Sequence, residues 1–231
     1  MRAAVAGLFL LFGAAEAAAG AWPREDGATF VAIGQTFSTG LRTLLAPNQT
    51  IDGYSSLYAE YGLTSKLTLG LDAAQGSGPD ASLRTALVFA RYPLGQSPWG
   101  DLFAADLGLG WREDSRDGNS ARLRAGLAWG RGFETGWGPG WMGIEGSAEL
   151  LTATNDQIFK ADATLGLKPT PKWMLILQAQ TGRYNATEPI LRIAPSVVRA
   201  IGSRGHLQFG LERTVAGGDT IGVRLGAWFS F

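Results

Sequence analysis

The sequence predicts an all-β protein, an antiparallel up-and-down transmembrane β-barrel of about twelve strands, with ten or fourteen strands as the alternatives. Apolar residues alternate with polar or small residues at every second position in segment after segment. The segments are about ten residues long, which suits a tilted strand that crosses a membrane. Charged residues make up only 17% of the chain, below the roughly 25% of soluble domains.

The chain begins with the features of a secretory signal peptide. Arg2 precedes an apolar stretch over residues 3–15, and the small residues Ala19, Gly20 and Ala21 follow. This order predicts a signal peptide over residues 1–21, cleaved before Trp22, and one barrel domain over residues 22–231. The alternative is an uncleaved N-terminal anchor, but the apolar stretch is shorter than the roughly 20 residues that a membrane-spanning helix needs.

Twelve later segments carry the two-residue period, and none has a convincing helical pattern. Short connections containing Gly, Pro or Ser alternate with looser polar ones such as residues 39–54, 113–119 and 184–189. An even number of strands with this alternation places both termini on the periplasmic side. The predicted strands are 28–38, 55–64, 66–75, 82–92, 101–112, 120–131, 141–152, 157–168, 172–183, 190–200, 205–214 and 220–231.

The chemistry of the two strand faces indicates which one points outward. The polar face is rich in glycine, and its charges are spaced apart, whereas a soluble barrel needs dense charged cover on its exterior. We therefore expect the apolar face to meet lipid, and a soluble barrel or β-sandwich is the alternative. Aromatic residues near strand ends are expected to form interfacial girdles. They are Tyr61, Phe89, Trp111, Trp129, Trp173 and Phe231.

The last strand ends on alternating apolar residues that include Phe229 and Phe231. This pattern resembles the C-terminal signal by which the barrel-assembly machinery recognises bacterial outer-membrane proteins. Residues 58–64 and 67–71 are also similar to a hairpin of porin-like or transporter-like barrels of small to medium size. The resemblance to these Gram-negative proteins implies a place in the cell outer membrane. It also implies outer-membrane lipid and the assembly machinery as partners.

If the apolar face meets lipid, the charged residues of the opposite face line a lumen. Their fixed charges predict a passive channel for small polar or charged solutes. The alternative is that the same side chains pair across the lumen and plug it. The lumen candidates are Glu60, Asp72, Arg84, Asp106, Arg112, Arg122, Arg124, Glu145, Glu149, Lys160, Asp162, Lys168, Arg192, Glu212 and Arg224.

Four of these candidates could form an electropositive ladder that favours anionic solutes. Arg122 and Arg124 share one face, and Arg84 and Arg112 lie on nearby strands. The competing interpretation, which we favour, is that these arginines pair with the carboxylates of Asp72, Asp106 and Glu145.

Composition argues against several other function classes. The chain has no cysteine, a formal net charge of zero and no run of basic residues. We therefore expect no disulfide, no thiolate metal site and no nucleic-acid partner, and the sequence suggests neither a cofactor nor a metal.

We also expect no enzymatic activity. An outer-membrane hydrolase with a Ser–His pair is a disfavoured alternative, because the single histidine, His206, directly follows a predicted periplasmic turn. A non-conducting barrel that serves surface-polymer export or adhesion is the other alternative.

Overall fold

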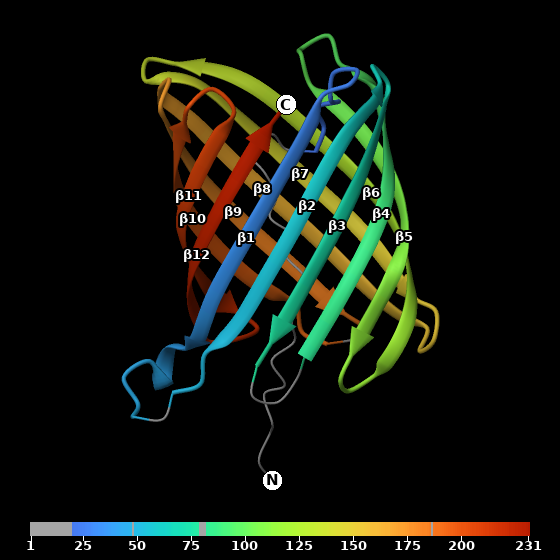
Figure 1. The fold of residues 1–231 in the computed structure, drawn as a ribbon, viewed down its shortest axis with the longest axis vertical. Coiled ribbons are helices and arrows are strands. Elements are labelled where there is room, and N and C mark those ends of the chain that lie inside the picture. The colour runs from blue at the N-terminus through green and yellow to red at the C-terminus, as the bar shows by residue number, and fades with distance from the viewer. Residues whose placement is uncertain (1–19, 48, 79–81, 186) are drawn as a thin grey trace.

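The structure is a computed structural model that describes residues 20–47, 49–78, 82–185 and 187–231. Each strand pairs antiparallel with its neighbours in sequence, and β12 pairs with β1, so that the sheet closes into a barrel (Figure 1). The predicted twelve-stranded antiparallel barrel is therefore confirmed. The strands are β1 Thr29–Gly40, β2 Asp52–Thr64, β3 Leu67–Ser77, β4 Ser82–Gln96, β5 Leu102–Asp114, β6 Gly118–Thr135, β7 Gly138–Leu151, β8 Asp156–Thr170, β9 Trp173–Tyr184, β10 Ile190–Ile201, β11 Gly205–Ala216 and β12 Thr220–Ser230.

The observed strands match the predicted ones except at their ends. β6 extends beyond the predicted segment because its ladder with β7 continues to the pair Thr135 and Gly138. Gly138 has a φ of +116°, a conformation that L side chains rarely adopt, so glycine suits this tight turn. The only helix in the described residues is the short 3-10 turn Leu41–Thr43, and none of the described helical structure is long and apolar enough to cross a membrane. The predicted signal peptide falls mostly outside the described residues.

Both ends of the barrel wall lie on one side. The start of β1 and the C-terminus meet at the same rim (Figure 1), and the backbone N–H groups of Thr29 and Phe231 donate to each other's carbonyl oxygens. We call this the terminal rim. The connection of residues 41–51 between β1 and β2 lies at the other end, which we call the distal rim.

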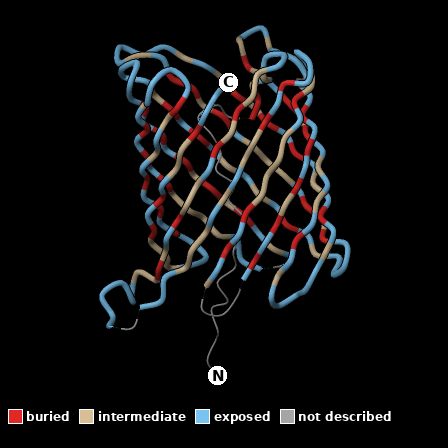
Figure 2. The backbone as a smooth tube through the Cα atoms, in the orientation of Figure 1, coloured by how far each residue is buried: buried red, intermediate tan, exposed pale blue. Residues whose placement is uncertain are grey.

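Exposure alternates along the strands, as Figure 2 shows, because successive side chains point to opposite faces of the sheet. On β5, Leu107 is 70% exposed while the adjacent Asp106 is 8% exposed. The same contrast recurs around the wall, with Val88, Leu127 and Phe209 all more than half exposed. The barrel thus has an apolar outer belt and a polar interior.

Aromatic side chains mark the outer surface near the rims. Tyr61, Trp111 and Trp173 are each more than 40% exposed. Trp129 is tethered at the terminal rim, because its indole N–H donates to the Asp101 carboxylate over 3.1 Å. Hydrogen bonds from Arg131 and Ser97 hold the pKa of Asp101 below its usual range.

Phe89 was expected in these girdles, and that assignment is wrong. Its ring lies inside the barrel and is 4% exposed. It covers Gly70, its partner on β3, where a Cβ atom would lie 2.0 Å from the ring. Trp141 covers Gly166 on β8 in the same way. Glycines on the inner face therefore make room for large rings from the adjacent strand.

Candidate functional site: the barrel lumen

The structure places most of the sequence-predicted lumen residues on the inner face. Their strand positions share the parity of the buried side chains, and the residues that lie there are Glu60, Asp72, Asp106, Arg112, Arg122, Arg124, Glu145, Glu149, Lys160, Asp162, Arg192, Glu212 and Arg224. Lys168 shares that parity near the terminal rim, where its ammonium group lies 5.5 Å from the centre of the Trp141 ring.

Arg84 does not line the lumen, contrary to the prediction. Its side chain is 61% exposed, and its guanidinium lies 3.9 Å from the carboxylate of Glu113, which is also exposed. Leu83 and Thr85, the neighbours of Arg84, are the inward-facing residues here. Arg84 therefore belongs to the outer face close to the distal rim, and the predicted four-arginine ladder loses one member.

Arg122 forms the most buried ion pair described. Its guanidinium donates to both Glu149 carboxylate oxygens over 2.7 and 2.8 Å, and to the Thr85 hydroxyl over 2.8 Å. The Lys160 ammonium lies 3.2 Å from the same carboxylate. The side chains of Arg122 and Glu149 are each only 1% exposed. This two-point contact fixes both groups against the wall formed by β4, β6, β7 and β8.

Arg124, two residues after Arg122 on the same face of β6, also has carboxylate partners. Its guanidinium lies 3.1 Å from a carboxylate oxygen of Asp106 and 3.3 Å from one of Asp72. It also lies 4.8 Å from the centre of the Phe89 ring. The sequence favoured pairing of the ladder arginines with Asp72, Asp106 and Glu145, and of these arginines Arg124 alone has partners from that set among the described residues. Arg122 pairs instead with Glu149, and Arg112 lies 2.7 Å from the carboxylate of Asp114.

Arg91, a buried inner-face residue, was missed by the sequence analysis. Its guanidinium donates to Glu60 over 2.6 Å and lies 3.8 Å from both Asp106 and Glu145. Arg91 pairs in register with Asp106 on β5. The signal that could have revealed it is therefore the cross-strand match of Arg91 with Asp106.

A second group of charges lies on β9 to β12. Glu212 lies 3.5 Å from the guanidinium of Arg192 and 3.7 Å from that of Arg224. Arg224 also donates to the side-chain oxygen of Gln178 over 3.0 Å. Gln178 is 1% exposed, so this amide forms part of the inner wall.

Polar atoms between the two groups lack hydrogen-bond partners within the described part of the chain. They are Oδ1 of Asp162 and both side-chain polar atoms of Gln180. The two residues are partners in register on β8 and β9, and Gln180 is fully buried. Buried polar groups normally have a partner, so these atoms mark a place in the inner wall where an internal water can bind.

Residues 20–28, which we call the mouth segment, fold into the lumen at the terminal rim. Arg24 contacts Glu60 through its Nε atom over 2.5 Å, and its guanidinium lies 4.4 Å from the centre of the Phe30 ring. The backbone N–H of Gly27 donates to the carbonyl of Gly62 over 2.8 Å. The mouth segment is thus held by charge, ring and backbone contacts.

Trp22 of the mouth segment reaches across this end of the lumen. Its ring lies against Gly130 on β6, where a Cβ atom would approach to 2.4 Å. It also packs against an inward-facing apolar cluster that includes Trp141 and Trp228. The predicted polar lumen therefore becomes apolar and narrow near the terminal rim.

We compared the surroundings of His206 with those of a Ser–His catalytic pair. The His206 ring lies 5.7 Å from the Trp228 ring, and among the hydrogen bonds of the described residues none joins it to a serine. No group of three or more His, Cys, Asp and Glu side chains in this part of the chain is placed to hold a metal ion.

No protein-family model matches the sequence, and no curated protein matches it. Solved structures match it over nearly its full length. The KdgM porin, solved in complex with disordered oligogalacturonate, is similar with a TM-score of 0.61 and 8% identity, over 87% of this chain and 99% of the porin. The NanC porin gives a TM-score of 0.59 and 10% identity, over 86% and 98% of the two chains.

A third similar structure is an outer-membrane channel from Pseudomonas putida F1. The TM-score is 0.60 at 14% identity, over 94% of this chain and all of the channel. At such low sequence identities, the similarity shows a shared fold and does not show a shared function. The chain has the closed twelve-stranded barrel fold of outer-membrane porins and channels.

Proposed function

We propose that the protein is a passive channel for small polar solutes in the bacterial outer membrane, with both termini in the periplasm. The apolar outer belt and the aromatic residues near the rims support insertion into lipid. The exposed aromatic side chains of Phe229 in β12 and of Phe231 beside it support recognition by the assembly machinery. The even strand number supports a common side for both termini.

The observation that carries this proposal is the direction of the ion pairs. Arg122 with Glu149, Arg124 with Asp72 and Arg91 with Glu145 all join strands of the β2–β8 wall that are at most three positions apart. The contacts of Arg224 and Glu212 stay within β9–β12. No ion pair between described residues joins the two groups. The ion pairs of the described residues therefore form within each group and do not tie one group to the other across the lumen.

The pairing also bears on which solutes pass. Because the inner-face arginines already have carboxylate partners, the inner face offers little uncompensated positive charge to an anion. They are Arg91, Arg112, Arg122, Arg124, Arg192 and Arg224. We expect hydroxylated solutes to pass with little preference for either sign of charge.

Purified protein reconstituted in planar bilayers tests this function. In a KCl gradient we expect discrete single-channel openings and a cation-to-anion permeability ratio close to one. Arg124→Gln removes the cation that faces Asp72 and Asp106, so we expect a shift toward cation selectivity. Arg84→Gln is the matched control, since Arg84 lies on the outer face, and it should leave the ratio unchanged.

Two outcomes would contradict the proposal. Absence of conductance from correctly folded protein would favour the scaffold alternative. A strong anion preference that Arg124→Gln abolishes would restore the arginine ladder. Liposome swelling with uncharged sugars of graded size would give the size limit of the channel independently.

A further inference from the structure

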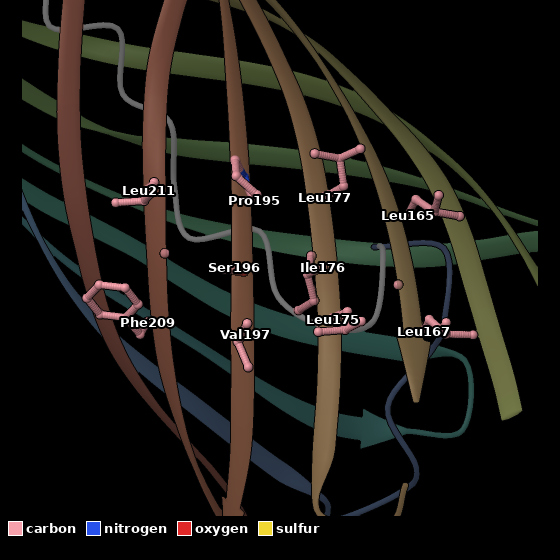
Figure 3. Close-up of a pocket in the computed structure, with 12 residues that line it drawn as sticks. Leu165, Leu167, Leu175, Ile176, Leu177, Pro195, Ser196, Val197, Phe209 and Leu211 are labelled. Atoms are coloured by element: carbon pink, nitrogen blue, oxygen red, sulfur yellow. The ribbon is translucent and has the colours of Figure 1, made fainter. Parts of the chain in front are cut away.

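The outer surface of β8 to β11 contains a groove of about 480 Å³ within the apolar belt. Figure 3 shows its lining side chains, with Pro195 between Leu177 and Leu211. The groove lies where the β10–β11 ladder is interrupted. Ile193 and Ser196 each pair with a residue of β11, whereas residues 194 and 195 between them do not. Pro195 has no N–H to donate, which explains a break at this point.

Three exposed cations lie at the end of the same wall, on the terminal rim. Arg199 on β10 has its guanidinium 5.5 Å from the centre of the Trp173 ring. Lys172 directly precedes Trp173, and Arg204 lies in the next turn. Both turns are fixed to the wall, because the carbonyls of Lys172 and Arg204 accept backbone hydrogen bonds over 2.9 Å.

The groove adjoins these cations. Leu175 and Val197, which line it, are partners in register, and the next outward-facing pair is Trp173 and Arg199. A molecule in the groove can therefore reach the basic rim without crossing polar surface.

No acidic residue lies in the β8–β11 part of the terminal rim. Between Asp162 and Glu212 the sequence has one acidic residue, Glu188, which lies in the connection at the distal rim. Among the ion pairs of the described residues, none involves Lys172, Arg199 or Arg204. Three uncompensated cations beside an interfacial tryptophan are complementary to a phosphate group at a membrane surface.

We propose that this face binds an anionic phospholipid of the periplasmic leaflet. One acyl chain lies in the groove around Pro195, and the phosphate lies against Lys172, Arg199 and Arg204. The proposal rests on the membrane location and on the orientation given under the proposed function. The structure thereby assigns to the barrel a lipid site separate from the lumen.

Native mass spectrometry of the purified full chain, with equal amounts of phosphatidylglycerol and phosphatidylcholine, tests the site. We expect preferential retention of phosphatidylglycerol. The variant K172Q/R199Q/R204Q should weaken that preference at least about tenfold, since each cation near a membrane surface contributes measurably to anionic-lipid binding. Val197→Trp fills the groove, keeps the cations, and should lower retention as well.

The control variant R42Q/R183Q/R213Q removes the same number of exposed cations toward the distal rim, from the β1–β2 connection, β9 and β11, and it should keep the preference. Equal retention of the two lipids, an unaltered preference in K172Q/R199Q/R204Q, or replacement of phosphatidylglycerol by lipid A would overturn the proposal. Heat-modifiable migration on gels confirms that each variant is folded. If the protein conducts but shows no lipid preference, only this site fails. If it does not insert into bilayers, the proposed function fails first.

Discussion

Replacing Arg122 with alanine lowers the free energy of unfolding of the barrel by about 3–5 kcal/mol. The substitution leaves the Glu149 carboxylate in the inner wall without the two hydrogen bonds that Arg122 gives it. It also leaves the Thr85 hydroxyl without its donor. Lys160, whose ammonium lies 3.2 Å from a Glu149 oxygen, is a point charge and cannot reproduce the planar two-point contact of a guanidinium. The measurement is urea unfolding in lipid vesicles, followed by tryptophan fluorescence.

A paired variant separates a lost partner from a lost side chain. R122M/E149Q removes both charges while it keeps the approximate size of both groups, so we expect most of the stability to return. Arg84→Ala is the exposed control, and it should change the free energy of unfolding by well under about 1 kcal/mol. A loss below about 1 kcal/mol for Arg122→Ala would mean that water in the lumen solvates Glu149 freely.

Releasing the mouth segment raises the single-channel conductance several-fold. W22A/R24A removes the ring that reaches across the lumen to Gly130 and the guanidinium that binds Glu60. Because Trp22 packs against the apolar cluster at this end of the lumen, its removal should stop the mouth segment from occluding the terminal rim. Conductance in planar bilayers and the rate of liposome swelling both report the change.

The exposed neighbours of these residues supply the control for the mouth segment. Glu25 and Asp26 are exposed, so E25A/D26A should leave the conductance as it is in the unaltered protein. If W22A/R24A conducts no better than E25A/D26A, the mouth segment does not limit the pathway, and the constriction lies elsewhere in the lumen.

The barrel could be predicted from the sequence because the same alternation of apolar and polar residues recurs in every strand. A closed sheet with one apolar and one polar face imposes a two-residue period on every strand. An ambiguous segment could therefore be assigned from the clear pattern of the other segments. Only the predicted ends of the strands differ from the structure. At β6, the strand continues into the turn through backbone hydrogen bonds, which leave no alternating hydrophobic pattern in the sequence.

The sequence did not correctly predict which residues of strand β4 face the lumen. β4 carries apolar residues at both parities and two arginines, Arg84 and Arg91, that face opposite sides of the sheet. Alternation alone could not decide which face was inner. The decision depends on Phe89 filling the space above Gly70, a contact between neighbouring strands. The mouth segment was equally unpredictable, since residues 20–28 have no periodic pattern.

Site-directed spin labelling tests most directly whether the apolar face of each strand meets acyl chains. The chain has no cysteine, so single cysteines at positions 107 and 165 can be labelled without a background, with position 147 on the inner face as the control. In lipid vesicles we predict high accessibility to oxygen and low accessibility to a water-soluble nickel reagent for labels replacing Leu107 and Leu165. A label replacing Ser147 should show the reverse order. Labels at 107 and 165 that are shielded from both reagents, in a protein that is monomeric in water without detergent, would contradict the account.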